Sequence, residues 1–267
     1  MSYVLSEPIE TLIQDQPCGA ITEKHDQNTD DKPPDKPLAV DVLIVGSGYG
    51  GAIAAMRLAG LKPNVYVFER GNEYATGDFP ESLGEFPSHV QFLRPDRDAP
   101  IGNADALFDF RIGDPVSVLV GNGLGGGSLI NANVALEPDD AVFSDPAWPS
   151  ALRNNRAALE PYFAEVETLL GVQCADVHGI RKFDALHRLA DSLGAPCHRA
   201  PIAVTQSKDL SVKITNAVGI AQNPCIGCAN CVTGCNVGAK NTLPMNALPL
   251  ARSRGARLFT GATVLSV

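Results

Sequence analysis

The clearest pattern of apolar positions begins at residue 38. Residues 38–45 are mostly apolar and rich in valine, with the length of a buried parallel strand. The glycine-rich segment 46–51 follows, and residues 52–59 then predict a helix that Gly60 ends. Residues 64–69 predict a second strand. Strand, tight turn, helix and strand in this order predict a βαβ unit at the start of the folded region.

The rest of the chain predicts a mixture of strands and amphipathic helices, and no internal repeat is visible. Strands are expected at 106–111, 116–120, 257–260 and 262–267, and helices at 151–170, 183–193 and 243–254. Residues 1–37 are polar and rich in proline towards their end, so we expect a disordered tail; an ordered strap over the surface is the alternative. Residues 38–267 are then one folded domain.

Composition and charge narrow the function classes. The 267 residues are 45% hydrophobic and 19% charged, which suffices for a proper core. The net charge of −9 argues against nonspecific binding to nucleic acid or anionic membranes. No apolar window reaches the roughly 18 residues of a membrane span, and the first residues do not have the pattern of a secretory signal. We therefore expect a cytoplasmic protein with no membrane span and no nucleic-acid partner.

The first glycine-rich segment has the pattern Gly46-x-Gly48-x-x-Gly51 between a strand and a helix. In a dinucleotide-binding turn the first glycine makes the turn, the second lets the backbone approach a pyrophosphate, and the third lets helix and strand pack closely. The pyrophosphate charge lies at the positive end of the helix. Glu69, at the end of the second strand, is placed to accept hydrogen bonds from the adenosine ribose. A glycine turn without a ligand is the alternative.

A second glycine-rich stretch, residues 121–138, decides between cofactors. Together with Ser144 it fits the first signature of the glucose–methanol–choline (GMC) oxidoreductases at every constrained position: Gly121, Asn122, Leu124, Gly125, Gly126, Gly127, Ser128, Ile130, Asn131, Ala135, Pro138 and Ser144. Residues 144–149 and 162–167 extend the likeness, which covers nearly all of residues 39–267. The chain therefore resembles this family, and within it the cholesterol-oxidase-like branch.

The resemblance implies an α/β fold: a Rossmann-type FAD-binding domain of the GMC architecture, with an incomplete substrate domain. It implies FAD as the cofactor, with Gly125, Gly126, Gly127 and Ser128 along the pyrophosphate and ribityl chain. Residues 131–134, with Asn131 and Val134, would approach the isoalloxazine, where an amide can polarise a ring that accepts hydride. Asn131 as a helix cap is the alternative.

Two further positions carry weaker expectations. Val264, in the last predicted strand, corresponds to a family segment whose backbone contacts the adenine, and an ordinary buried strand valine is the alternative. The five histidines lie in no recognisable catalytic context, and surface or core roles are favoured for them.

Four of the seven cysteines lie in one run. Its C-x2-C-x2-C-x3-C spacing is that of bacterial ferredoxins, although Asn236 stands where that pattern has proline. An iron–sulfur centre, a zinc site with four thiolates and reduced structural thiols all fit the run. An odd number of cysteines without a secretory signal argues against a disulfide framework. The candidate metal ligands are Cys225, Cys228, Cys231 and Cys235.

The resemblance implies oxidation of CH–OH groups by hydride transfer to flavin, with a small-molecule alcohol or sterol as substrate. The histidine base of the family lies in a C-terminal region for which no segment corresponds here, so no catalytic residue can be named. We therefore expect the chain to be an N-terminal portion: a truncated gene product, a fragment, or one half of a split enzyme whose partner is a C-terminal half. The alternative is a flavin-binding fragment or accessory chain without turnover, relaying electrons through a cluster to an acceptor protein.

Overall fold

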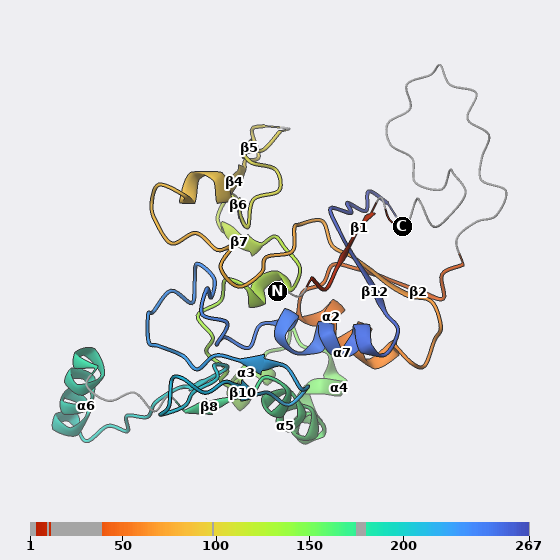
Figure 1. Cartoon of the computed structure of the whole chain (residues 1–267). Helices are drawn as coiled ribbons and strands as arrows, with labels where there is room; N and C mark the ends of the chain where they lie inside the picture. Colours follow the sequence, from red (N-terminus) through yellow and green to blue (C-terminus); the bar gives the residue numbers. More distant parts are fainter. Residues whose placement is uncertain (1–3, 10, 12–38, 98, 175–179, 267) are drawn as a thin grey trace, which may run out of the picture.

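The computed structural model describes residues 4–9, 11, 39–97, 99–174 and 180–266 (Figure 1). The tail expected over residues 1–37 therefore lies largely outside the described residues. The described part contains two four-stranded sheets and two two-stranded ones. None of its helices is long and apolar enough to cross a membrane.

The first sheet contains the predicted βαβ unit. Its strands β1 (Glu7–Pro8), β12 (Arg257–Thr260), β3 (Val65–Phe68) and β2 (Val42–Val45) lie in this order and are all parallel. Helix α2 (Tyr49–Leu58) connects β2 to β3. The helix begins three residues before the predicted start. Gly48 has an extended backbone and precedes the helix, and Gly50 and Gly51 lie in its first turn.

The expectation of a disordered tail is wrong for residues 4–9. Strand β1 pairs with β12, and Leu5 is buried in the core. The carboxylate of Glu73 accepts hydrogen bonds from the amides of Leu5 and Ser6, each at 2.7 Å. These partners lie more than sixty residues away in sequence, so the local composition on which the expectation rested could not reveal them.

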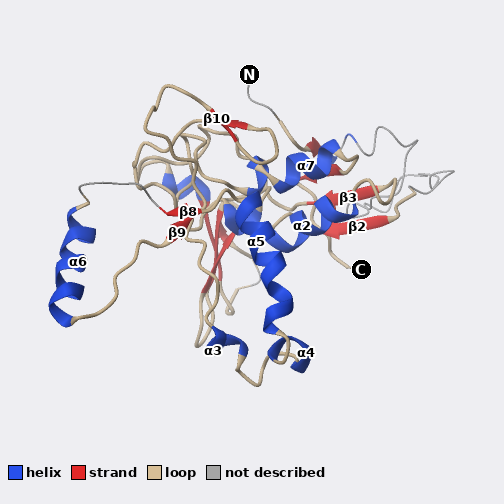
Figure 2. Ribbon diagram, turned by 90° about the horizontal axis from the view of Figure 1, so that it is seen from below, coloured by secondary structure: helices blue, strands red, loops and turns tan. Residues whose placement is uncertain are grey.

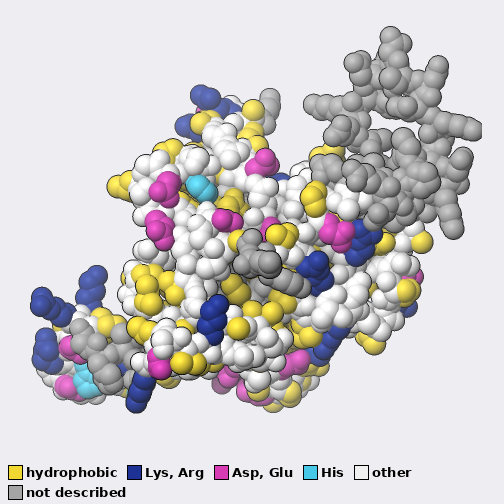
Figure 3. Space-filling view, in the orientation of Figure 1, with side chains coloured by type: hydrophobic (Ala, Val, Ile, Leu, Met, Phe, Trp, Pro, Cys, Tyr) yellow, Lys and Arg dark blue, Asp and Glu magenta, His cyan; other side chains and the backbone are white. Residues whose placement is uncertain are grey.

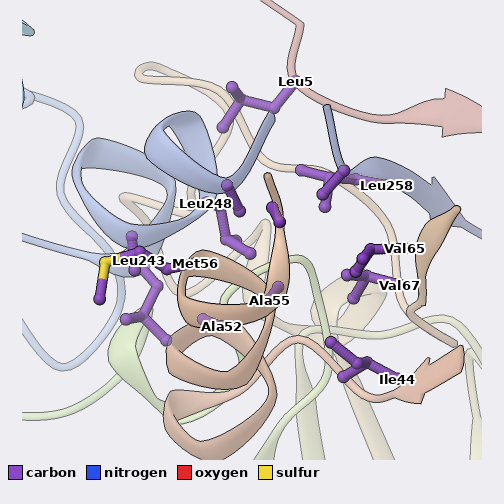
Figure 4. Close-up of a cluster of buried hydrophobic side chains, with 14 of the residues drawn as sticks. Leu5, Ile44, Ala52, Ala55, Met56, Val65, Val67, Leu243, Leu248 and Leu258 are labelled. Atoms are coloured by element: carbon purple, nitrogen blue, oxygen red, sulfur yellow. The ribbon is translucent and has the colours of Figure 1, made fainter. Parts of the chain in front are cut away.

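Helices α2 and α7 (Ala247–Ser253) cover one face of the first sheet (Figure 4). The contact uses small residues, with Ala52, Ala55 and Ala251 fully buried, so the two helices approach closely. Ile44, Val67 and other inward side chains of the strands complete this core. The core fixes the start of α2, and hence the first glycine-rich loop, against the sheet.

The second sheet ends at the other glycine-rich stretch. Strands β5 (Ile101–Gly102), β4 (Val90–Leu93), β6 (Phe108–Arg111) and β7 (Val118–Gly121) lie in this order. Strands β6 and β7 confirm the two strands predicted in this part of the chain, with ends that differ by up to two residues. The chain leaves β7 and enters the 3-10 turn η2 (Gly126–Ser128).

Two helices predicted as continuous are interrupted. The segment 151–170 contains α4 (Ser150–Arg153), the 3-10 turn η3 (Arg156–Leu159) and α5 (Glu160–Leu169), with Asn155 outside the helical region. The segment 243–254 contains the turn η4 (Leu243–Met245) and α7, separated by Asn246, whose side chain accepts from the Ala247 amide at 2.6 Å. In both places asparagine offers the backbone a non-helical alternative.

Short elements connect these parts. They are the turn η1 (Phe86–His89), the helices α3 (Asp140–Phe143) and α6 (Arg181–Leu193), and the strands β8 (Gln173–Cys174), β9 (Pro201–Ile202), β10 (Ile214–Thr215) and β11 (Ala221–Gln222). Helix α6 confirms the helix predicted over 183–193. The strand predicted over 262–267 is wrong, because residues 262–266 have no strand structure.

Candidate cofactor-binding site

The two glycine-rich loops lie against each other. One connects β2 to α2, and the other follows β7, more than seventy residues later. A Cβ built on Gly126 would lie 2.9 Å from Cα of Gly48, so only glycine allows this approach. The sequence predicted two loops at one cofactor, and the fold brings them to one place.

Ser47 joins the loops. Its hydroxyl donates to Oε2 of Glu69 at 2.6 Å and accepts from the amide of Gly125 at 2.9 Å. The Ser47 side chain is fully buried. Sequence reasoning missed this residue, because it occupies an unconstrained position between Gly46 and Gly48.

Glu69 lies at the carboxyl end of β3, as expected, and is buried. Its carboxylate accepts from the amide of Ser47 at 2.9 Å and from the amide of Gly71 at 3.0 Å, besides the Ser47 hydroxyl. A carboxylate has about four acceptor positions, so one remains for a further donor such as a ribose hydroxyl. The ribose contact therefore stays a prediction that the geometry accommodates.

The glycines leave an open cradle at the start of α2. A Cβ built on Gly46, Gly48 or Gly127 would meet no atom within 4 Å, so these positions face free space. No side chain caps the N-terminus of α2, and its first amides remain available. By contrast, a Cβ on Gly51 would lie 1.9 Å from the Gly46 carbonyl oxygen, which fits its predicted role in helix–strand packing. Free amides, a positive helix end and an uncrowded backbone fit a pyrophosphate.

Hydrogen bonds of the Ser128 hydroxyl fix the conformation of the second loop. Gly125 has a φ of 103°, and Ser128 donates to its carbonyl oxygen at 2.7 Å. The same hydroxyl accepts from the amide of Leu243 at 3.1 Å, so Ser128 is buried and bonded within the protein. Gly127 is then the residue of this loop that presents open backbone, while Ser128 shapes the turn.

Asn131 connects the end of the second loop to α2. Its amide nitrogen donates to the hydroxyl of Tyr49 at 2.7 Å, and its oxygen accepts from the amide of Asn133 at 3.1 Å. Asn131 therefore caps no helix; it stabilises a turn in which Asn133 has a φ of 61°. Burial raises the pKa of Tyr49, although the hydrogen bond with Asn131 opposes this shift, so the phenol is neutral at physiological pH.

A hollow of about 340 Å³ adjoins this turn. Asn131, Val134 and Tyr49 line it, and the contact of residues 131–134 with an isoalloxazine stays a prediction. Apolar side chains of α5, among them Phe163 and Val166, also line it. The hollow is mainly apolar with some polar groups in its lining, which is typical of a small-molecule site.

Lys240 is buried under the same segment, and sequence reasoning did not single it out. Its ammonium donates to the carbonyl oxygens of Leu129 at 3.0 Å, Asn131 at 2.7 Å and Cys231 at 2.9 Å. Burial lowers the pKa of Lys240 to about 8. Three acceptors need three N–H donors, which only the charged form has. Near neutral pH, Lys240 thus places a positive charge beside the carbonyl of Asn131.

The cysteine run does not form a metal centre in this structure. Within the described residues, which include all four candidate ligands, no group of three or more His, Cys, Asp or Glu side chains is placed to hold a metal ion. The cysteines are free, and Cys228 is exposed. The prediction of an iron–sulfur centre is not supported, nor is the zinc alternative or an electron relay through a cluster. None of these four cysteines is buried, so the structural-thiol alternative, which rests on burial, stays a prediction.

The geometry around the run explains its departure from the ferredoxin pattern. The Asn236 side chain accepts from the amides of Gly77 at 3.0 Å and Phe79 at 3.1 Å, and donates to the Phe79 carbonyl at 2.8 Å. Proline could make none of these hydrogen bonds. Gly234 packs on the Phe79 ring, where a Cβ would lie 2.0 Å from the nearest ring carbon. These contacts fix the run to residues 77–79 without a metal.

The remaining predicted position is Val264. It is half-buried and lies outside any strand. The alternative of an ordinary buried strand valine is therefore wrong. Its contact with an adenine stays a prediction.

The parallel βαβ unit and the two apposed glycine loops define the class: an α/β protein with a Rossmann-type dinucleotide-binding fold. Comparison with known proteins gives the family. The sequence pattern of the GMC oxidoreductases matches residues 40–267, and the chain belongs to the GMC oxidoreductase family.

Two kinds of relative are similar to the chain. A cholesterol oxidase of Mycobacterium tuberculosis is 32% identical over 237 residues, and one of Acinetobacter baumannii is 28% identical over 236. The long-chain-alcohol oxidase FAO4B of Arabidopsis thaliana is 26% identical over 229 residues. The matches cover 84%, 85% and 84% of this chain, in the order given. They cover 39% and 41% of the two cholesterol oxidases and 26% of the long-chain-alcohol oxidase. The chain thus spans about two fifths of the length of the cholesterol oxidases it matches.

Proposed function

We propose that the protein is an FAD-dependent oxidoreductase that oxidises the CH–OH group of an alcohol or sterol, and that this chain supplies its cofactor-binding part. The observation that carries the proposal is the contact between the two glycine-rich loops, with Gly48 and Gly127 open and the amides of α2 uncapped beside them. The family and the names of the relatives support the reaction class.

In this proposal the residues that hold FAD are those of the cradle and of the segment after it. Gly46, Gly48 and the first amides of α2 take the pyrophosphate, and Glu69 takes the ribose. Gly127 lies along the ribityl chain, and residues 131–134 face the isoalloxazine. Bound FAD supplies the hydride acceptor, and the protein groups orient it.

The hollow beside residues 131–134 supports an apolar alcohol as the substrate. Val134, Leu136 and Phe163 contribute apolar surface, whereas Asn131 and Tyr49 give polar groups near the predicted flavin position. An alcohol with a large hydrocarbon part would gain from burial there. Cholesterol and long-chain alcohols, named for the relatives, are both of this chemical kind.

The base that takes the hydroxyl proton is proposed to come from outside the described residues. The described lining of the hollow contains Glu137, Glu167 and Lys240 as its ionisable groups besides Tyr49, and no histidine. Lys240 is bonded to three carbonyl oxygens as an ammonium and has no acceptor for a proton in that form. A partner segment or a C-terminal half would then complete the enzyme.

The test separates cofactor binding from turnover. Purified chain is titrated with FAD, and the bound form is mixed anaerobically with cholesterol or with a long-chain alcohol while the flavin absorbance is followed. The proposal predicts stoichiometric FAD binding by the chain, and bleaching by one of the two alcohols once a C-terminal portion of a relative is added. Absence of FAD binding contradicts the proposal, and bleaching by the chain alone contradicts the assignment of the base.

A further inference from the structure

Tyr49 lies between the two ends of the proposed FAD site. It is the first residue of α2, directly after Gly48 of the cradle, and its side chain lines the hollow beside residues 131–134. Helix α5 also lines the hollow and lies beside α2 (Figure 2), to which the ion pair of Glu165 with Arg57 joins it. Tyr49 therefore connects the place of the pyrophosphate with the place proposed for the flavin ring.

The hydrogen bonds of Asn131 determine which way its side-chain amide faces. Its Oδ1 accepts from the backbone amide of Asn133 at 3.1 Å, which assigns the oxygen side of the group. Its Nδ2 is then the atom that donates to Oη of Tyr49 at 2.7 Å. An amide nitrogen carries two N–H groups, and the second one of Asn131 has no acceptor among the described residues. Because Asn131 lines the hollow, this N–H is available to a group bound there.

The main chain of the same turn is held by other groups. The ammonium of Lys240 donates to the carbonyl oxygen of Asn131 at 2.7 Å, and the amide of Ala203 donates to that of Asn133 at 2.8 Å. The Tyr49 hydroxyl bonds the side chain of Asn131 instead. It therefore fixes the rotation of the amide group, and its loss should leave the path of the main chain unchanged.

Single hydrogen-bond donors matter in this site because the protein offers little general attraction to an anionic cofactor. Acidic side chains are spread over the described part of the face shown in Figure 3, and the net charge is −9. Burial raises the pKa of Tyr49, so the phenol is neutral and brings no further negative charge to the site. The directed N–H of Asn131 is therefore a valuable group beside a ring that gains electrons.

We propose that Tyr49 is a positioning residue whose hydroxyl holds the amide of Asn131, so that the free N–H faces the isoalloxazine. The inference rests on the proposed function, because it takes FAD as the cofactor. A donor that is already in place stabilises the ring more strongly after it has accepted hydride than before. Tyr49 thus contributes to the affinity for the flavin end of FAD and raises the reduction potential of the bound cofactor, and it does so through Asn131.

The first test compares two ligands on the full chain. The probes are FAD and ADP, which has the adenosine and pyrophosphate but no flavin. Tyr49→Phe removes the hydroxyl and keeps the ring. We expect this variant to bind FAD roughly tenfold more weakly than the wild type and to bind ADP equally well. The reduction potential of its bound FAD, measured against a reference dye, should be lower than in the wild type.

Tyr162→Phe is the matched control. Tyr162 lies on α5, is 62% exposed, and its hydroxyl has no hydrogen-bond partner among the described residues. This variant should match the wild type with both ligands and in potential. Circular dichroism and chemical denaturation verify that the three proteins fold alike.

A double-mutant cycle tests the route through Asn131. If Tyr49 acts by holding this amide, its hydroxyl has nothing left to position once the amide is gone. Asn131→Ala and the double variant Tyr49→Phe/Asn131→Ala should then bind FAD with equal affinity and give it equal potentials.

Three results would overturn the inference while leaving the proposed function intact. They are unchanged FAD affinity in Tyr49→Phe, equal losses for ADP and FAD, which would mean a general effect on the cradle, and additive effects in the cycle, which would mean that the phenol acts independently of Asn131. A wild-type chain that binds no FAD contradicts the proposed function, and this inference with it. Binding of FAD by the wild type separates the two kinds of failure.

Discussion

The hydroxyl of Ser47 accepts a hydrogen bond from the amide of Gly125 at 2.9 Å, across 78 residues of sequence. The same hydroxyl donates to Glu69 at 2.6 Å. One buried side chain therefore connects both glycine-rich loops to the acid at the end of β3. The alignment of the cradle depends on this connection, together with the hydrogen bond from Asn131 to the Tyr49 hydroxyl.

Substitution of Ser47 tests the connection. Ser47→Ala removes both hydrogen bonds of the hydroxyl group. The Gly125 amide then loses its acceptor, and Oε2 of Glu69 keeps only the hydrogen bond from the amide of residue 47. We expect the free energy of unfolding to fall by about 1–3 kcal/mol and FAD affinity to fall roughly tenfold. Chemical denaturation and FAD titration measure the two effects. Ser253→Ala, which removes an exposed hydroxyl bond to Leu250, is the control and should change neither value.

The burial of Lys240 predicts a pH dependence of stability. Its pKa of about 8 in the folded protein lies below the ordinary value of 10.5, because burial disfavours the charged form. Between these values the unfolded chain keeps a proton that the folded chain has lost, so the folded state gains stability as pH rises. In Lys240→Met this contribution is absent.

The measurement is the difference in unfolding free energy between wild type and Lys240→Met, taken at several pH values. This difference cancels the titration of groups that do not interact with Lys240; the thiols of Cys231 and Cys235, whose charges act on its pKa, are the exceptions. We expect it to shift in favour of the wild type by roughly 3 kcal/mol from below pH 8 to above pH 10.5. A constant difference across this range would contradict the burial of the ammonium.

Two glycines in the cysteine run provide a matched pair. Gly234 has a φ of 112° and faces the Phe79 ring at 2.0 Å from a built Cβ, whereas Gly227 has a φ of 73° and faces open space. Gly234→Ala should lower the unfolding free energy by about 3 kcal/mol or more, because it adds a clash to the strain. Gly227→Ala should cost only about 1–2 kcal/mol of backbone strain. Thermal unfolding compares them, and equal losses would show that the contact with Phe79 is not formed.

The absence of an assembled metal site among the described residues leads to a prediction about the metal content of the purified protein. Protein purified without oxygen should contain neither iron nor acid-labile sulfide, and a thiol assay under denaturing conditions should detect at least the six cysteines of the described residues. The described geometry assembles no metal site from Cys225, Cys228, Cys231 and Cys235. Stoichiometric iron with sulfide would reinstate the iron–sulfur hypothesis and show that the run rearranges around a cluster.

Much of the fold follows from the sequence because its signals are local. The valine-rich strand, Gly46-x-Gly48-x-x-Gly51 and the alanine-rich start of α2 lie within some twenty residues, and periodicity and glycine spacing describe such units well. The sequence-based predictions fail where residues far away in sequence determine the local structure. Glu73 orders residues 5 and 6, and β12 pairs with β1. No local pattern carries that information.

The site shows the same division. The site glycines were predictable because the backbone at each position requires a residue without a side chain. By contrast, Ser47, Tyr49 and Lys240 act through hydrogen-bond partners far away in sequence. The spacing of the cysteines suggested a cluster, but spacing does not determine where thiols point. Asn236, in place of proline, was the one local sign that the run has a different role.

The central claim is that the open glycine backbone at the start of α2 holds FAD, and Gly48→Ala tests it most directly. Gly48 has a φ of −62°, which alanine adopts freely, and its built Cβ meets no protein atom within 4 Å. We therefore predict that the variant keeps its unfolding free energy within about 0.5 kcal/mol. FAD titration followed by flavin fluorescence should show at least a roughly tenfold weaker affinity than in the wild type, because the methyl group occupies the place of the pyrophosphate. Unchanged FAD affinity in this stable variant would contradict the account.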